Sequence, residues 1–174
     1  MSTATALLEQ AMDDDAAALV LADWLEERGE DARAAAVRRC VAGDELKHAP
    51  WMGSALVPLL EHLPLAGMGK ALLPFLVAPV AEADGDLPGG SEWRGNLWQG
   101  GRAVPTRLAL GRTANRVAGT LREDFTRLYG GIAADGTFHF AGVAVGRVLA
   151  FVTHRVEGDG IHPGLYLLRL GKGG

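Results

Sequence analysis

The sequence predicts an α+β protein in which a small helical bundle is followed by an antiparallel up-and-down β barrel or rolled meander sheet. Apolar residues recur with the helical period up to residue 83, and they alternate with period 2 after residue 91. A run of turn-forming residues separates these two parts. We therefore expect a helical domain over residues 1–83, a linker over 84–90 and a β domain over 91–174.

The composition fits a protein with a buried core, because 48% of the 174 residues are hydrophobic. Charge is uneven: residues 1–50 hold 11 acids and 5 bases, whereas residues 91–174 hold 6 acids and 11 bases. Either the two halves attract each other or the basic half contacts nucleic acid, and we favour the first. Cys40 is the single cysteine, which excludes an intrachain disulfide and a Cys-based zinc site within one chain. The N-terminus lacks a secretory signal pattern, so we expect a cytoplasmic protein.

Three amphipathic helices are predicted in the first 45 residues. Residues 3–12 place apolar side chains at helical spacing, and the three aspartates at 13–15 offer N-terminal caps for a second helix over about 16–28. Gly29 suits the left-handed position that ends a helix, and Asp31 suits the cap of a third, alanine-rich helix. Alanine allows close helix approach, so the sequence predicts a compact three-helix unit.

The second predicted helix carries a dense motif that extends into the third. Its residues are Leu19, Val20, Ala22, Asp23, Trp24, Leu25, Glu26, Glu27, Arg28, Gly29, Arg33 and Ala34. Through this motif residues 5–40 resemble the repeat-companion domain, a short helical module of unknown function found in bacteria with large genomes. The chain departs from that family after Arg33, where three alanines replace an acid and bulky apolar residues. The resemblance implies association with repeat proteins and multi-domain systems, and it supplies no catalytic residues.

Acidic residues surround the tryptophan of this motif. Asp23 and Glu27 lie one helical turn apart, and Arg28 and Arg33 are within reach, so ion pairing is the ordinary interpretation. A docking surface for a partner is the second interpretation, and catalysis by the carboxylates is the third. We expect Trp24 to anchor the core, and we take Asp23, Trp24 and Glu27 as candidate docking residues.

An apolar connector with several prolines follows. Glu61 and Lys70 are the only charged residues between positions 51 and 81, and two short helices are predicted there. Neither is long enough to cross a bilayer, so we do not expect a membrane protein. Such apolar surface is expected to pack against the rest of the chain or against another protein, and Leu60, Leu73 and Phe75 are candidate docking residues.

The second half predicts an antiparallel meander. Seven strands are expected, at residues 93–99, 104–110, 117–121, 128–134, 138–140, 148–156 and 165–170. Asp135-Gly136 is the strongest two-residue hairpin signal in the chain, and Pro163-Gly164 is a further turn signal between the last two strands.

The order of parts from Gly90 and Trp93 onward is similar to calycin-type barrels such as lipocalins and avidins, over residues 90–171. The chain departs from them by one extra residue between glycine and tryptophan, by one strand fewer than eight, and by having no disulfide. The resemblance implies an interior that holds a small apolar ligand. The alternative, which we favour, is an interior filled by Leu108, Leu128, Phe138, Phe140 and Val148.

Arginines alternate with the apolar residues of the predicted strands. They are Arg107, Arg116, Arg122, Arg147, Arg155 and Arg169. An acidic protein surface, including the helical half of this chain, suits them better than nucleic acid, because few tyrosines accompany them. We take Arg107, Arg147 and Arg169 as candidate docking residues.

The sequence lacks the common catalytic motifs: it has no HExxH, no His-x-His, no phosphate-binding loop and no GxSxG. We therefore expect no cofactor and no metal, and we predict a non-enzymatic adaptor or structural subunit of a bacterial complex that binds another protein or itself. A carrier of a small apolar ligand is the alternative, and an enzyme that uses scattered His, Asp or Glu residues is the third hypothesis.

Overall fold

The computed structural model describes residues 2–44, 69–83, 92–99, 102–124, 135–157 and 160–169. The elements are α1 (Thr3–Ala11), α2 (Asp15–Glu26), α3 (Asp31–Ala42), the 3-10 helix η2 (Gly69–Leu72), α5 (Leu73–Val77), β1 (Glu92–Gln99), β2 (Arg102–Thr113), β3 (Arg116–Asp124), β4 (Asp135–Val145), β5 (Val148–Glu157) and β6 (Gly160–Arg169). The predicted linker over 84–90, the predicted strand over 128–134 and Leu60 lie outside the described residues.

The three N-terminal helices begin and end where local chemistry satisfies their free backbone groups. Asp14 caps α2, because its Oδ1 accepts a hydrogen bond from the Ala16 amide at 3.0 Å. Gly29 has a φ of +74°, which confirms its left-handed position after α2. The predicted cap of the third helix is wrong: Glu30 occupies the cap position, and Asp31 is the first helical residue. An acid in that first turn interacts with the positive end of the helix dipole instead.

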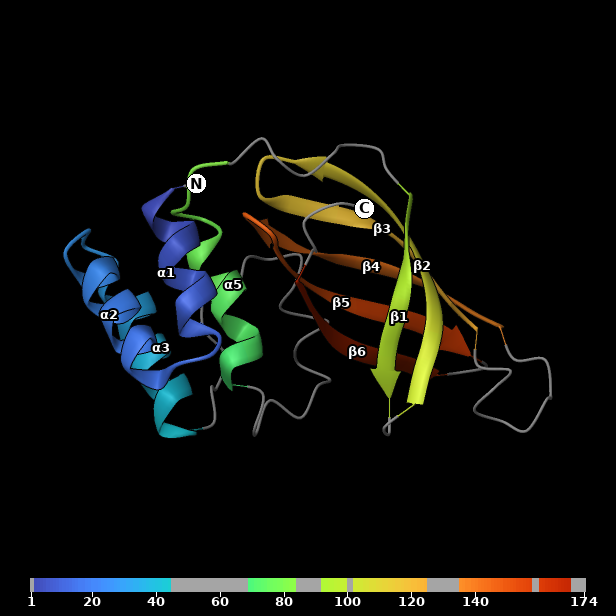
Figure 1. The fold of residues 1–174 in the computed structure, drawn as a ribbon, viewed down its shortest axis with the longest axis horizontal. Coiled ribbons are helices and arrows are strands. Elements are labelled where there is room, and N and C mark those ends of the chain that lie inside the picture. Colours follow the sequence, from blue (N-terminus) through green and yellow to red (C-terminus); the bar gives the residue numbers. More distant parts are fainter. Residues whose placement is uncertain are drawn as a thin grey trace.

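Within the described residues, six antiparallel strands form one sheet in which each strand pairs with the next along the chain, in the order β1 to β6. The sheet curls into a half-barrel, and in Figure 1 β1 and β2 cross in front of β4, β5 and β6. The predicted class, a helical bundle followed by a rolled meander sheet, is confirmed.

The predicted hairpin turn at Asp135-Gly136 is wrong, because both residues lie in β4, opposite Asp124 and Glu123 of β3. A two-residue turn lies instead at the other end of this strand, at Gly146-Arg147 between β4 and β5. Gly146 has a φ of +56°, and glycine at the first central position is typical of a type II′ hairpin.

Pro163-Gly164 also lies within a strand, β6, where these residues stand opposite His154 and Thr153. Proline is tolerated there because β6 is the last strand of the described sheet, and its nitrogen donates no ladder bond.

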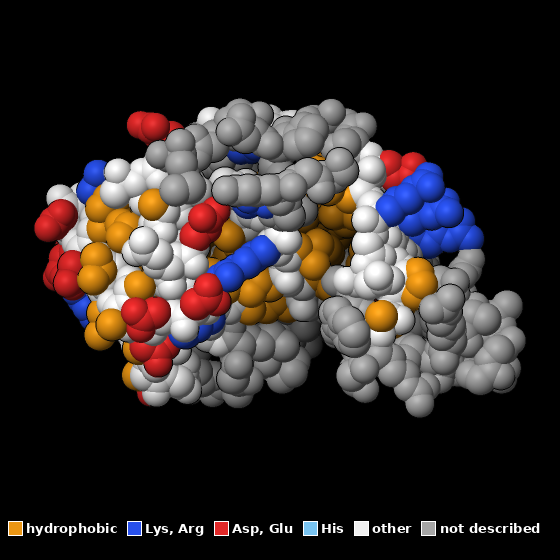
Figure 2. Space-filling view, viewed as in Figure 1, with side chains coloured by type: hydrophobic (Ala, Val, Ile, Leu, Met, Phe, Trp, Pro, Cys, Tyr) orange, Lys and Arg blue, Asp and Glu red, His pale blue; other side chains and the backbone are white. Residues whose placement is uncertain are grey.

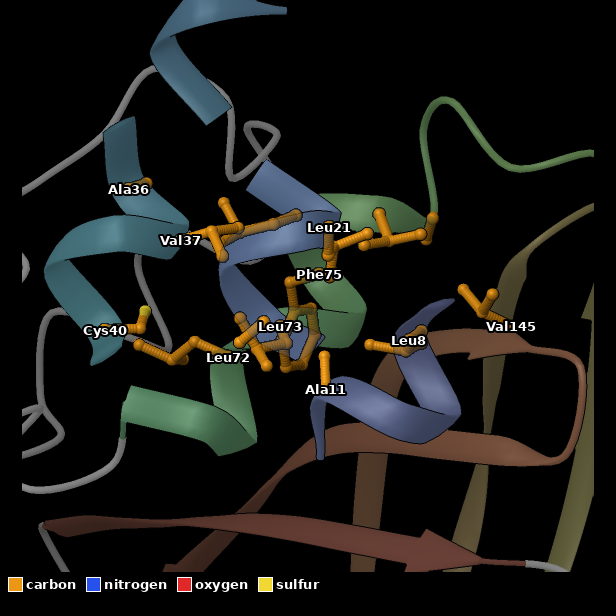
Figure 3. Close-up of a cluster of buried hydrophobic side chains, with 14 of the residues drawn as sticks. Leu8, Ala11, Leu21, Ala36, Val37, Cys40, Leu72, Leu73, Phe75 and Val145 are labelled. Carbon is orange, nitrogen blue, oxygen red and sulfur yellow. The ribbon is translucent and has the colours of Figure 1, made fainter. Parts of the chain in front are cut away.

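One apolar cluster joins the helices to the outer face of β4 and β5. Figure 3 shows side chains of α1, α2, α3, η2 and α5 pointing toward one another, with Val145 of β4 beside Leu8. From the sheet, the cluster takes Val143, Val145, Val148, Ala150 and Val152. Val148 therefore packs under the helices and does not fill the sheet interior as predicted, since its side chain projects from the other face of β5.

A second cluster occupies the inner, concave face. Its buried members are Leu108, Leu110, Val117, Leu121, Phe140, Ala144, Leu149 and Phe151. Trp93, Phe138, Tyr166 and Leu168 pack against them and are partly exposed. The sheet thus has two apolar surfaces, one covered by helices and one enclosed by its own curl.

Polar contacts hold the helical layer to the sheet. Asn115, in the turn between β2 and β3, donates from Nδ2 to the carbonyls of Ala78 and Ala81, each at 2.8 Å. Gly146 lies so close to α1 that an added Cβ would be 2.1 Å from Thr5 Cγ2. Arg169 of β6 forms an ion pair with Asp13 at 2.8 Å, which has the sign expected from the charge asymmetry between the two halves.

Candidate functional site

The predicted docking residues on α2 are partly engaged by α3. Arg38 of α3 binds Asp23 at 2.8 Å and Glu26 at 2.5 Å. The hydrogen bonds that Arg38 donates to Glu26 and, to a smaller extent, to Asp23 raise the pKa of its guanidinium. The expected partners of Asp23, Arg28 and Arg33, are therefore wrong, since packing of α3 against α2 places Arg38 beside it.

Trp24 packs its partly buried ring against the helical core, as expected for an anchor. The Arg28 guanidinium lies 3.9 Å from the centre of that ring and donates to the Trp24 carbonyl at 3.4 Å. Glu27 is exposed, and no residue within the described ranges forms an ion pair with it.

Two candidate residues of the connector are buried within the chain. Leu73 is 0% exposed and Phe75 is 2% exposed, and both contact the helical cluster in Figure 3. Their surface is used to join the helices to the sheet, so it offers nothing to a partner in this conformation.

Arg147 and Arg169 line a groove of about 640 Å³ between the sheet and the helices. On the helical side the groove is lined by Ala6, Glu9, Gln10, Asp13, Asp14 and Ala17. Arg169 donates to the Glu9 carbonyl at 3.3 Å, and its hydrogen bond to Asp13 lowers the pKa of that carboxyl. These two arginines face the acidic helical half of their own chain.

Arg107 belongs to a row of arginines on the outer face. In the strand register Arg94 of β1 stands opposite Arg107 of β2, and Arg107 stands opposite Arg122 of β3. All three are exposed. We call these three residues the arginine row. Figure 2 shows Lys and Arg side chains gathered at the right-hand end of the molecule, where β1 and β2 lie in Figure 1.

The arginine row lies on the part of the outer face that the helices do not cover. The helical cluster packs on β4 and β5, with Leu165 and Leu167 of β6 beside it. These strands lie toward the edge of the sheet opposite β1. Glu92 pairs with Arg94 at 3.6 Å, and both side chains are well exposed. Water and ions therefore surround the row in the isolated chain.

The inner face holds a buried acid. Glu123 of β3 is 0% exposed and stands opposite Thr106 of β2. It is hydrogen-bonded to Tyr166 of β6, a strand that is not its neighbour in the sheet, so the bond crosses the concave interior. Burial raises the pKa of Glu123, and the hydrogen bond with Tyr166 acts in the opposite direction. Burial also raises the pKa of Tyr166 above its usual range, reinforced by the charge of Glu123.

The cysteine, possible metal ligands and possible membrane-spanning helices were each considered in the described parts of the chain. Cys40 is buried, and this burial raises the pKa of its thiol to about 11, which keeps it in the unreactive protonated form. Across the residues described, no three His, Cys, Asp or Glu side chains gather as a metal site would require. None of the described helices has the length and apolar character needed to cross a bilayer.

Comparison of the chain with protein-family models, with curated proteins and with solved structures finds no match. The resemblances of residues 5–40 and 90–171 therefore stay predictions.

Two residues of these surfaces were missed in the sequence. Arg94 was not grouped with the other arginines, because only the strand register places it beside Arg107. Glu123 follows Val117, Gly119 and Leu121 at the next inward position of the same strand. An acid at an inward position of a period-2 pattern is the signal that points to it.

Proposed function

We propose that the protein is a non-enzymatic adaptor, or a structural subunit of a complex, whose sheet docks an acidic surface of another protein through the arginine row. The observation that carries this proposal is the register, which sets the backbones of Arg94, Arg107 and Arg122 side by side on an exposed face.

Like charges directly opposite each other destabilise an antiparallel sheet, so the row has no evident benefit for the isolated fold. Neighbouring strands are about 4.8 Å apart, and carboxylates one turn apart on a helix are separated by about 6 Å. An acidic helix laid across the strands therefore brings carboxylates within reach of successive guanidinium groups. Such charge-assisted, two-pronged hydrogen bonds are stronger than neutral ones.

A protein suits the row better than a single-stranded nucleic acid. Bases need flat rings on which to stack, and of the described residues beside the row on this face Ala109, Thr120 and Thr137 offer none, whereas His139 offers one. The resemblance of residues 5–40 to the repeat-companion domain points in the same direction, because it implies association with other proteins.

The test is affinity purification of the tagged protein from its own host after mild cross-linking. Wild type is compared with the double variant Arg94→Glu/Arg107→Glu and with Arg116→Glu, a matched charge reversal at an exposed outer-face position of β3 outside the row. We expect wild type and Arg116→Glu to retain one acidic partner that the double variant loses. Raising the salt concentration is expected to weaken the same interaction.

The proposal fails if the double variant keeps the partner or if the interaction is insensitive to salt. Sedimentation of the purified protein tells whether the acidic partner is a second copy of the chain, because its helical half also exposes acids such as Asp23 and Glu26. If the partner is a second copy, wild type and Arg116→Glu sediment as oligomers and only the double variant sediments as a monomer.

A further inference from the structure

The outer side of α2 exposes two large apolar side chains. Leu19 is 43% exposed and Val20 is 53% exposed, and in the described parts of the chain no other large apolar side chain reaches this exposure. Both lie opposite the side of the helix that is buried in the helical cluster. Packing within one chain therefore leaves them in water, and a second surface that covers them gains free energy by doing so.

These side chains belong to a continuous stripe along α2. Positions separated by three, four, seven and eleven residues lie on one side of a helix. Here all the positions of this kind are exposed: Ala16, Leu19, Val20, Asp23 and Glu27. We call these five residues the α2 stripe, with an apolar pair, Leu19 and Val20, and an acidic pair, Asp23 and Glu27. The stripe is thus apolar toward the start of the helix and acidic toward its end.

The α2 stripe and the arginine row lie at opposite ends of the molecule. In Figure 1 α2 is at one end of the long axis, and β1 and β2 lie toward the other. Figure 2 shows acidic side chains gathered over the helical end and basic side chains gathered at the opposite end. Residues 2–44 carry 10 acids and 4 arginines, so the helical end stays acidic although Arg38 binds Asp23 and Glu26. The two surfaces have opposite charge, and they meet only between two copies of the chain.

The sheet beside the arginine row has a surface for the apolar half of the stripe. On the outer face of β2, Ala109 and Gly111 follow Arg107 at alternate positions, and Ala118 of β3 stands opposite Gly111. All three of these small residues are exposed. Their short side chains leave a low surface against which protruding leucine and valine side chains pack.

The spacing of the two surfaces agrees when α2 of a second copy lies along β2, rather than across the strands. At about 1.5 Å per helical residue, the centre of the acidic pair is about 8 Å from the centre of the apolar pair. At about 3.4 Å per strand residue, Arg107 and Ala109 are about 7 Å apart. When the acidic pair lies over Arg107, the apolar pair therefore lies over Ala109. Arg94 and Arg122 of the neighbouring strands then flank the carboxylates.

We propose that the protein associates with itself head to tail, the α2 stripe of one copy lying along β2 of the next copy, against its arginine row. This inference rests on the proposed docking role of the arginine row and names its partner as a second copy of the chain. Because the two surfaces differ, each end of such a pair keeps a free stripe or a free row, so association continues into an open chain or closes as a ring. The paired surfaces are small, so the contact is reversible.

Sedimentation velocity of the purified full-length protein tests this inference at concentrations from about 5 to about 200 µM, a range that includes weak contacts. We expect the average mass of the wild type to rise with concentration beyond that of a dimer. Adding salt to about 0.5 M is expected to raise the apparent dissociation constant at least about 10-fold, because the charges on both surfaces are exposed.

Two variants each remove one surface. The row variant, Arg94→Glu/Arg107→Glu, places acids against the acidic pair. The stripe variant, Leu19→Ala/Val20→Ala/Glu27→Ala, removes the apolar pair and one carboxylate, and alanine is the strongest helix former at these exposed positions. Each variant is expected to weaken self-association at least about 10-fold.

Changes of charge outside the two surfaces serve as controls. Arg116→Glu lies on β3 beyond the apolar end of the docked stripe, and Asp44→Ala lies after α3; both residues are exposed. Both controls are expected to associate like wild type. Urea unfolding establishes that each variant is folded, and the single changes Arg107→Glu and Glu27→Ala replace a row or stripe variant that is not.

An equimolar mixture of the row variant and the stripe variant gives the decisive measurement. Each variant alone is expected to be monomeric at a concentration where wild type is mostly associated. In the mixture, the intact stripe of the row variant meets the intact arginine row of the stripe variant. Dimers are therefore expected, and no larger species, because neither outer end of such a dimer carries a working surface.

The inference is overturned if wild type stays monomeric over the whole range, if either variant associates like wild type, or if the mixture stays monomeric. It is also overturned if a control loses association, since the contact then lies elsewhere. A monomeric wild type leaves the proposed docking function in place when affinity purification still yields an acidic partner that the row variant loses. When that partner is absent too, both proposals are rejected.

Discussion

The two faces of the sheet accommodate charge in opposite ways. On the inner face the acid Glu123 is 0% exposed and is hydrogen-bonded to a tyrosine from across the interior. On the outer face Arg94, Arg107 and Arg122 stand side by side in water. Glu123 and Arg122 are consecutive residues of one strand, so the alternation of side chains alone separates the two settings.

This difference shows that exposure to water determines how strongly each charged group affects the stability of the fold. Removal from water couples the ionisation of Glu123 to folding, because the charged form is destabilised only in the folded state. Water and salt screen the arginine row, so repulsion within it is small. The following changes test this contrast.

The largest effect is expected from the packed inner face. Phe151→Ala removes a ring that is 0% exposed and contacts two other rings, and we expect the free energy of unfolding to fall by about 3–5 kcal/mol. Thr137→Ala, at an exposed outer-face position of β4, should change it by less than about 0.5 kcal/mol. Urea unfolding of both variants measures the difference, and similar losses would contradict a packed inner face.

A smaller effect is expected where the helices cover the outer face. Asn115→Ala removes two hydrogen bonds and leaves the carbonyls of Ala78 and Ala81 without that donor, so we expect a loss of about 1–3 kcal/mol. Asn115→Asp keeps the shape but places an acceptor against two carbonyls, and it should be at least as harmful. Chemical denaturation measures the free energy of unfolding of both variants. A loss no larger than that of an ordinary surface substitution would mean that the turn at Asn115 does not hold α5 in place.

The pH dependence of stability tests the buried acid. Its folded pKa is raised above the ordinary Glu value of 4.5, so between those two pKa values the folded state binds more protons than the unfolded state. The free energy of unfolding of wild type, relative to Glu123→Gln, should therefore fall as the pH rises through that interval and become constant above it. Unfolding measured at a series of pH values gives the difference, and a difference that is flat or rises with pH rejects a raised pKa.

The smallest effect is expected in the arginine row. Arg107→Thr relieves repulsion from two neighbouring arginines, and threonine has good strand propensity. We therefore expect the free energy of unfolding to rise by about 0.2–1 kcal/mol at low salt. The gain should shrink as salt is added, because the charges are exposed. Arg116→Thr supplies the comparison outside the row, and an equal, salt-independent gain there would attribute the effect to propensity alone.

The sequence predicts the class of the fold because both periods are long and unbroken. The helices begin and end within two residues of the expected positions, and Gly29 ends α2 as expected. The apolar alternation of β2 and β3 also predicts which residues face inward. The sequence pattern does not predict contacts between distant segments. Arg38 lies beside Asp23 only because α3 packs on α2.

The arginine row depends on the pairing register of the strands, which the residue pattern does not predict. Asp135-Gly136 has the composition of a tight turn, yet it continues a ladder, whereas Gly146-Arg147 forms the turn. A displaced turn changes every cross-strand neighbour that follows it. The arginine row needs two correct registers at once, so residue types alone do not reveal it.

The shared cluster of helices and strands has a consequence for synthesis of the chain. The helical side chains emerge from the ribosome first, but the strand residues that cover them, Val143 to Val152, follow α3 by about 100 residues. At about 5–20 residues per second, the part of this cluster that β4 and β5 cover stays exposed for roughly 5–20 s. A nascent chain stalled before β4 thus exposes a surface that chaperones recognise and that aggregates readily, and release of the last three strands ends this exposure.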